Sequence, residues 1–151
     1  AAGRVAWRSG RRKAADLVGL WLLHLVLHLA APAEVERRST YLACARDGRP
    51  EWFVLGPVAD PAPLLRDLLD RYRLGLTLPL PFFPETALAW AEAAPGKAMN
   101  KARAAWTSSE WSRGEDADPA YAWFFADRDP LDEPFIEQAA LFRTILPHRE
   151  R

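Results

Sequence analysis

The sequence predicts a mixed α/β domain in which a β-hairpin or small sheet is flanked by several helices. Three observations favour this class. Half of the 151 residues are hydrophobic, which is enough to fill the core of one domain of ordinary size. Two strand-like segments between residues 37 and 55 are joined by an Asp-Gly turn. Apolar residues recur at helical spacing on both sides of that pair.

The charges of the chain sum to zero but are unevenly placed. Lys plus Arg total 20 and Asp plus Glu total 20, which excludes a strongly basic domain that binds nucleic acid through charge alone. Residues 1–13 carry five basic side chains and no acid, whereas residues 110–137 carry nine acids and two arginines. We therefore predict a solvated basic arm or linker over residues 1–13. Because no initiator methionine precedes Ala1, we interpret the chain as a piece of a longer protein.

The most apolar segment covers residues 17–31 and predicts a helix that is buried on most of its faces and ends at Pro32. A secretory signal over residues 11–33 and a membrane span are the other interpretations. The 15 uncharged residues fall short of the roughly 20 that a bilayer needs. His24 and His28 share a helix face, but no third metal ligand accompanies them, so we place both at the polar edge of the helix. His148, near the other end of the chain, is predicted to be exposed.

A β-hairpin is predicted from residue 37 to residue 55. Residues 37–46 and 51–55 have the residue types and alternation of strands, and Asp47-Gly48 supplies the positive φ of a tight turn. Cys44 is the only cysteine, which excludes a disulfide framework and a cysteine-rich zinc module. A cysteine nucleophile needs a histidine base that this stretch lacks, so we expect Cys44 to face the core from its strand.

Helices follow the hairpin. Asp60 as the N-cap, Pro61 in the first turn and Gly75 at the end mark the first of them. Three prolines in residues 76–84 exclude a regular helix there, and we expect an extended segment held by Phe82 and Phe83.

The remaining residues predict four more helices and one acidic loop. The helices cover residues 84–94, 97–107, 119–126 and 132–146, and the loop covers residues 108–119. Residues 14–147 are thus predicted to form a single domain, with residues 148–151 as a tail.

Two sets of side chains are candidates for binding. The first would contact a nucleic-acid backbone if the fold brought its members together: Arg71, Arg73, Lys97, Lys101 and Arg103. Solvated helix faces are the alternative explanation of these five. The second would form part of a protein interface, where aromatic residues are enriched: Trp111, Trp123, Phe124 and Phe125. Burial in the core is the alternative for these four.

The hairpin followed by a helix has the order of elements found in metal-dependent nucleases of the restriction-endonuclease type. Such a nuclease places an Asp and then an acid-x-Lys triplet on adjacent strands, where the acids hold divalent metal ions and the lysine polarises water. Here the first strand has no Asp, and residues 54–58 contain neither an acid nor a lysine. Asp47 and Glu51 flank the turn, and no glycine-rich phosphate loop is present. We therefore predict a restriction-endonuclease-like core without catalytic residues, metal ligands or cofactor.

Four stretches together resemble the C-terminal domain of RecC, the gamma subunit of the bacterial helicase–nuclease exodeoxyribonuclease V. They are the Leu- and Trp-rich segment at 17–31, the hairpin leading into residues 64–90, the NKARAAW run at residues 100–106 with the later Gly114-Glu115, and the Phe135-x-x-x-Ala139 helix that runs to Pro147. The most specific feature is the pairing of Tyr72 and Gly75 with Pro79-Leu80 and Pro84. The resemblance spans roughly residues 12–147.

The resemblance implies a scaffold role. In that family the domain looks like a nuclease core that has lost its catalytic residues, and Gly56, Pro57 and Val58 lie where an active relative would carry Asp-x-Lys. The implied partners are the beta and alpha subunits, RecB and RecD, together with duplex or single-stranded DNA in the assembled complex. The implied setting is double-strand-break repair and homologous recombination in the bacterial cytoplasm, with no membrane. Two alternatives stay open, an active metal-dependent nuclease and a small envelope-targeted protein.

Overall fold

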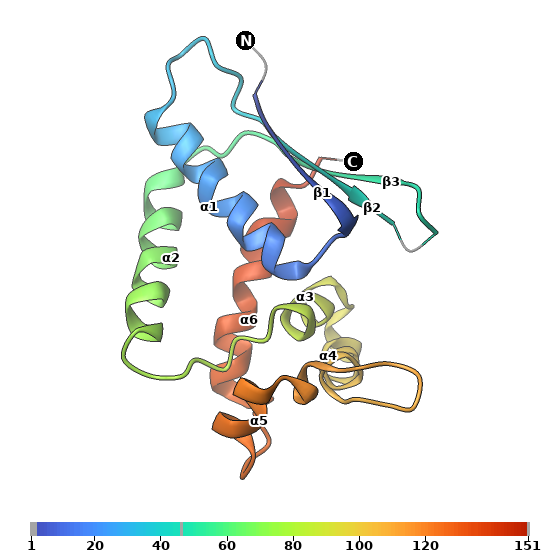
Figure 1. Ribbon diagram of the computed structural model, residues 1–151. Coiled ribbons are helices and arrows are strands. Elements are labelled where there is room, and N and C mark those ends of the chain that lie inside the picture. Colours follow the sequence, from blue (N-terminus) through green and yellow to red (C-terminus); the bar gives the residue numbers. More distant parts are fainter. Residues whose placement is uncertain (1–2, 46, 151) are drawn as a thin grey trace. The chain divides into compact units, whose positions relative to one another are not determined.

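The computed structural model describes residues 3–45 and 47–150 (Figure 1). The chain divides into two compact units, which we call the sheet unit (residues 1–74 with 147–151) and the helical unit (residues 75–146). The expectation of a single domain over residues 14–147 stays a prediction. Three ends of predicted elements lie outside the described residues: the start of the basic arm at residues 1–2, the strand end Arg46 and the tail end Arg151.

A three-stranded sheet organises the sheet unit. Its strands are β1 (Arg4–Arg11), β2 (Ser39–Cys44) and β3 (Pro50–Leu55), in the order β1-β2-β3 (Figure 1). β2 and β3 pair antiparallel, which confirms the predicted hairpin, and Gly48 in its turn has a φ of 82°. β1 pairs parallel to β2, so the long connection between them carries a helix, as parallel strands require.

The prediction of a loose basic arm over residues 1–13 is wrong for β1. Its side chains alternate between half-buried and exposed along the whole strand, as they do in a sheet with one covered face. Arg4 and Arg8 lie on the covered face and are half-buried, so the basic residues belong to the strand. The charge run concealed this alternation because the partner strand of β1 comes 28 residues or more later in the chain.

The helix α1 (Ala14–Ala30) covers the inner face of the sheet (Figure 1). That face is formed by buried strand residues: Ser39, Tyr41, Ala43, Phe53 and Leu55. The helix buries one stripe that includes Leu17, Trp21 and Leu25, whereas Leu23, Val26 and Leu29 are exposed. The predicted helix is confirmed, but it is buried on one side and not on most of its faces. Within the described residues, no helix is long and apolar enough to cross a membrane.

The helix α2 (Pro61–Gly75) begins and ends at the predicted residues. Capping by Asp60 stays a prediction. None of its residues is buried, and its leucines are half-buried or exposed. The described residues therefore cover the apolar face of α2 only in part.

The helical unit contains four helices and two short 3₁₀ turns. The helices are α3 (Pro84–Glu92), α4 (Ala98–Trp106), α5 (Pro119–Phe125) and α6 (Glu133–Ile145), and the turns are η1 (Pro95–Lys97) and η2 (Glu115–Ala117). All four helices were predicted to within two residues at each end. Phe83 lies at the centre of the unit, with its ring 4.2–6.0 Å from those of Trp106, Tyr121, Phe125 and Phe135. The predicted mixed α/β class, with a small sheet and several helices, is confirmed.

Two smaller expectations are wrong. Cys44 lies on the half-buried outer face of β2, because Ser39, Tyr41 and Ala43 are the residues that face the core. The end of the chain is not a free tail: after the turn η3 (Leu146–His148), Arg149 forms a bridge to Leu55 and the Glu150 N–H donates to the Val54 carbonyl oxygen at 2.9 Å. Residues 148–150 thus continue the sheet beyond β3.

Candidate functional site

Residues 56–58 follow β3 directly, where an active nuclease of the expected type would carry its catalytic triplet. In the structure their backbone is bound by histidines. The Gly56 carbonyl oxygen lies 2.9 Å from His24 Nε2, and the Gly56 N–H donates to the His148 carbonyl oxygen at 2.9 Å. A Cβ atom at position 56 would lie 2.8 Å from a Glu150 carboxylate oxygen, so a side chain there would require the Glu150 side chain to move.

His24 is fully buried, which corrects our placement of this residue at a polar edge. A carbonyl oxygen only accepts hydrogen bonds, so Nε2 carries the proton and donates to Gly56. Nδ1 then accepts from the Ser39 hydroxyl at 2.9 Å. Burial lowers the pKa of His24 to about 4, which keeps the ring neutral as this pattern requires. His148 is half-buried with its ring 5.2 Å from that of Trp21, so the prediction that it is exposed is also wrong.

The two acids beside the hairpin turn each pair with an arginine. Asp47 lies 3.4 Å from Arg49 Nε, and Glu51 lies 3.3 Å from Arg12 Nη2. Within residues 3–45 and 47–150, no three His, Cys, Asp or Glu side chains form a group that could hold a metal ion.

A pocket of about 400 Å³ lies between β1 and α1 in the sheet unit. Its polar wall includes Arg4, Arg8, Asp16 and Tyr41, and its apolar wall includes Leu20. The sequence patterns did not indicate this pocket, because it depends on the pairing of β1 with β2.

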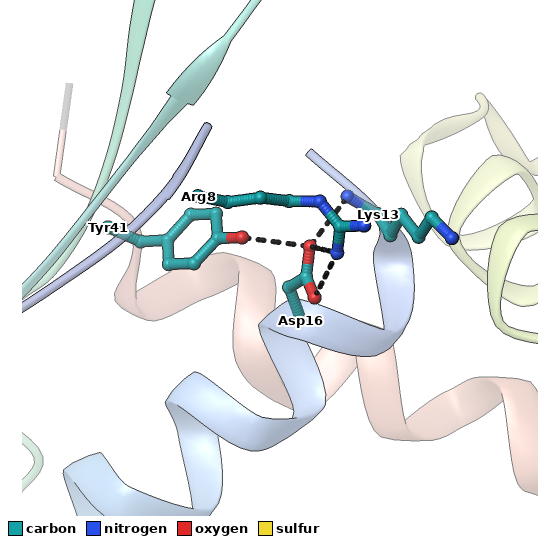
Figure 2. A network of polar contacts seen from close by, with 4 residues as sticks. All are labelled: Arg8, Lys13, Asp16 and Tyr41. Carbon is teal, nitrogen blue, oxygen red and sulfur yellow. Dashed lines mark hydrogen bonds and ion pairs between the residues drawn. The ribbon is translucent and has the colours of Figure 1, made fainter. Parts of the chain in front are cut away.

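Asp16 is the centre of a polar network at one wall of the pocket, shown in Figure 2. Its carboxylate accepts from Arg8 Nη1 at 3.1 Å, from the Tyr41 hydroxyl at 2.8 Å and from the Lys13 backbone N–H at 3.0 Å. One carboxylate therefore joins β1, β2 and the start of α1. The contact with Lys13 satisfies a backbone N–H at the start of α1. The sequence does not indicate it, because Lys is not a residue type that marks an N-cap.

The electrostatics of the network fix its protonation. Partial burial alone would raise the pKa of Asp16, but the bonds from the Lys13 N–H, Tyr41 and Arg8 outweigh it and the pKa is lowered. Burial, with the bond to Asp16, raises the pKa of Tyr41 to about 12. Near neutral pH Asp16 is ionised and Tyr41 is protonated. Neither group is poised for proton transfer, and the network holds three elements together.

Replacing Asp16 with asparagine is expected to lower the free energy of unfolding by about 1–2 kcal/mol, because Arg8 loses its carboxylate in a partly buried place. Urea denaturation measures the change. Asp70→Asn is the matched control, since Asp70 pairs with Arg73 at 3.1 Å on the exposed face of α2. That variant should lose only about 0.3–0.5 kcal/mol. Equal losses in the two variants would contradict the role of the network.

The five candidate DNA-binding residues are divided between the two units. Arg71 and Arg73 lie on α2, whereas Lys97, Lys101 and Arg103 lie on η1 and α4. Three of them form ion pairs within their own unit: Arg71 with Asp67 at 2.8 Å, Arg73 with Asp70 at 3.1 Å and Arg103 with Asp129 at 2.8 Å. A phosphate would have to compete with these carboxylates. DNA binding by the five residues stays a prediction.

The four candidate interface aromatics separate by exposure. Trp111 is 92% exposed, Trp123 is 82% exposed and Phe124 is 56% exposed. Phe125 is buried, with its ring 5.2 Å from that of Phe83, so it belongs to the core and not to a surface. An interface role for the other three stays a prediction.

The protein is of the mixed α/β class, with a small three-stranded sheet and six helices among the described residues. The family model described as the RecC C-terminal domain matches residues 1–95, and the chain belongs to this family. RecC is a subunit of exodeoxyribonuclease V, the RecBCD complex of DNA repair and recombination. No curated protein matches the chain.

Proposed function

We propose that this chain is a non-catalytic scaffold module of exodeoxyribonuclease V, built on a restriction-endonuclease-like core that has lost its catalytic residues. The observation that carries the proposal is the segment after β3. Its residues Gly56, Pro57 and Val58 supply no metal ligand, and the Gly56 backbone is bound by His24 and His148. A segment used in this way supports the sheet, and it carries neither an acid nor a lysine.

The proposed partners are the beta and alpha subunits, RecB and RecD, in the bacterial cytoplasm. The exposed side chains of Trp111, Trp123 and Phe124 support a role in subunit contact, because large aromatic residues are enriched at the centres of interfaces. In the assembled complex, Arg71, Arg73, Lys97, Lys101 and Arg103 are the proposed DNA contacts. The chain then assists recombination repair by holding subunits and not by cleaving DNA.

A cleavage assay tests the absence of catalysis. The chain is incubated with end-labelled duplex and single-stranded DNA in magnesium and in manganese, and a known nuclease shows that the substrates can be cut. We expect no metal-dependent cleavage by the chain. Cleavage that disappears in the Asp47→Ala, Glu51→Ala double variant would identify an active nuclease that uses these acids. Cleavage that survives in the double variant would place a catalytic site elsewhere, and either result would overturn the proposal.

A further inference from the structure

The strand β1 forms one edge of the three-stranded sheet. β2 lies on one side of it, and no described strand pairs with its other side, which we call the free edge. Successive residues of a strand point their backbone N–H and C=O groups to opposite sides. The Arg4 N–H donates to the Arg38 carbonyl oxygen at 2.8 Å, on the side of β2. The backbone groups of Val5 and Trp7 therefore point to the free edge, where a further strand can pair with them.

The pocket between β1 and α1 opens at this free edge. Among the described residues, its lining comes from β1 and α1, apart from Tyr41 of β2. Trp7 lies on the exposed outer side of β1 and still lines the pocket, so the pocket reaches round the edge of the strand. A strand added to β1 would direct every second side chain into this pocket, because strand side chains alternate between the two faces.

One side of the pocket carries a cation without a counter-ion. The Nη1 atom of Arg4 is buried and has no hydrogen-bond partner among the described residues. The Asp16 carboxylate already accepts from three groups in the network of Figure 2, so it is not available to Arg4. Burial also lowers the pKa of Arg4, as desolvation of an unpaired cation does. A carboxylate brought in from outside would supply the missing acceptor.

The opposite wall of the pocket, formed by α1, is apolar. Leu20 and Leu23 line it, and Leu23 is 44% exposed. Gly19 lies in the same wall, and a Cβ atom built there would meet nothing within 4 Å. This wall therefore has room for an apolar side chain from an added strand.

The charge of β1 favours an acidic partner strand over a second copy of the chain. β1 carries Arg4, Arg8 and Arg11 and no acidic residue. Two copies paired through this edge would place arginines opposite arginines, and like charges on neighbouring strands are destabilising. A strand with acidic side chains would instead complement the edge.

We propose that the free edge of β1, with the pocket lined by Arg4, Gly19, Leu20 and Leu23, binds an extended segment of a partner protein as a further strand. The inward side chains of the segment are acidic, apolar and acidic in turn. The acids lie against Arg4 and the exposed part of Arg8, and the apolar side chain between them enters the pocket. Main-chain hydrogen bonds supply the affinity and the pocket supplies the specificity. This binding goes beyond the exposed aromatic residues of the scaffold role and does not depend on them.

Fluorescence anisotropy with a labelled peptide tests the proposal on the whole chain. The probe is Thr-Glu-Thr-Leu-Thr-Glu-Thr, whose side chains read the same in both directions and suit a parallel or an antiparallel strand. We expect saturable binding with a Kd below about 1 mM. Two controls should bind at least about tenfold more weakly: the peptide with lysine in place of glutamate, and the glutamate peptide with methylated backbone nitrogens. No binding of the probe, or equal binding of either control, would overturn the proposal.

Gly19→Leu separates binding from stability. The substitution fills the pocket from α1 and replaces a poor helix former with a good one. We expect peptide binding at least about tenfold weaker, with an unfolding midpoint no lower than that of the wild type. Gly96→Leu is the matched control, since a Cβ atom there also meets nothing within 4 Å and the residue lies in the helical unit. Unchanged binding in a folded Gly19→Leu variant, or equal losses in both variants, would contradict the position of the site.

Arg4→Met tests the cation. The variant removes the buried donor that lacks a partner, so the chain should be at least as stable as the wild type. Binding of the glutamate peptide should weaken about tenfold and binding of the lysine peptide should not. Arg73→Met, which removes an exposed arginine from α2, should change neither. Unchanged binding of the glutamate peptide in Arg4→Met would overturn the role of Arg4.

Sedimentation equilibrium distinguishes a second copy of the chain as the occupant. We expect the wild type and Gly19→Leu to give the same mass. A wild-type dimer that dissociates in Gly19→Leu would show that the free edge binds another copy of the chain, and the proposal would be wrong.

Discussion

Replacing His24 with alanine is expected to lower the free energy of unfolding by about 3–4 kcal/mol. The ring is fully buried and is bonded at 2.9 Å to the Ser39 hydroxyl and at 2.9 Å to the Gly56 carbonyl oxygen. The variant leaves a cavity and two buried polar groups without partners. Urea denaturation followed by circular dichroism measures the loss.

His28→Ala is the control for this variant. His28 lies one turn away on the same helix, is half-buried and accepts one long bond, 3.4 Å, from the Val58 N–H. We expect a loss below about 1 kcal/mol. A His24→Ala variant that is no less stable than His28→Ala would show that the histidine does not hold the segment after β3.

The same residue predicts a dependence of stability on pH. Burial lowers the pKa of His24 to about 4, and repulsion from His28, His148 and Arg4 adds to this, while the bond to Gly56 opposes it. In the unfolded chain the pKa returns to about 6.5, so the unfolded state binds the proton more readily. The contribution of neutral His24 is complete above pH 6.5 and is lost as the pH falls toward 4. In His24→Ala this part of the pH dependence should disappear, and its persistence would assign it to another group.

Replacing Phe83 with alanine is expected to cost about 4 kcal/mol in the helical unit. Phe83 is fully buried, precedes α3 directly and contacts rings from α4, α5 and α6. Its loss removes the shared centre of four helices. Near-ultraviolet circular dichroism and urea denaturation measure the effect.

Phe82→Ala provides the comparison. Phe82 is half-buried and stacks on one ring, that of Phe142, at a centroid distance of 6.0 Å. We expect a loss of about 1–2 kcal/mol, because less of the ring is removed from water. Similar losses at positions 82 and 83 would contradict the central position of Phe83.

The elements predicted from the sequence are those that local chemistry specifies. The Asp-Gly turn and the prolines at the starts of α2, α3, α5 and α6 place the hairpin and helices without knowledge of their neighbours. β1 was missed because its pairing with β2 is non-local and its arginines masked the alternation. The prediction for Cys44 is wrong because the alternation of a strand does not say which of its two faces points toward the core.

The candidate site was only partly predictable. The absence of an acid and a lysine after β3 is visible in the sequence. The hydrogen bond from His24 to Gly56 is not visible there, because it links residues 32 positions apart. The pocket between β1 and α1 likewise requires the pairing of β1 with β2.

Co-expression with tagged RecB and RecD tests the proposed scaffold role most directly. We expect the folded chain to co-purify with at least one of the two subunits. The Trp111→Ala, Trp123→Ala, Phe124→Ala triple variant should lose that binding, whereas Trp52→Ala, which removes an exposed indole from the sheet unit, should keep it. A folded wild-type chain that co-purifies with neither subunit would contradict the scaffold role.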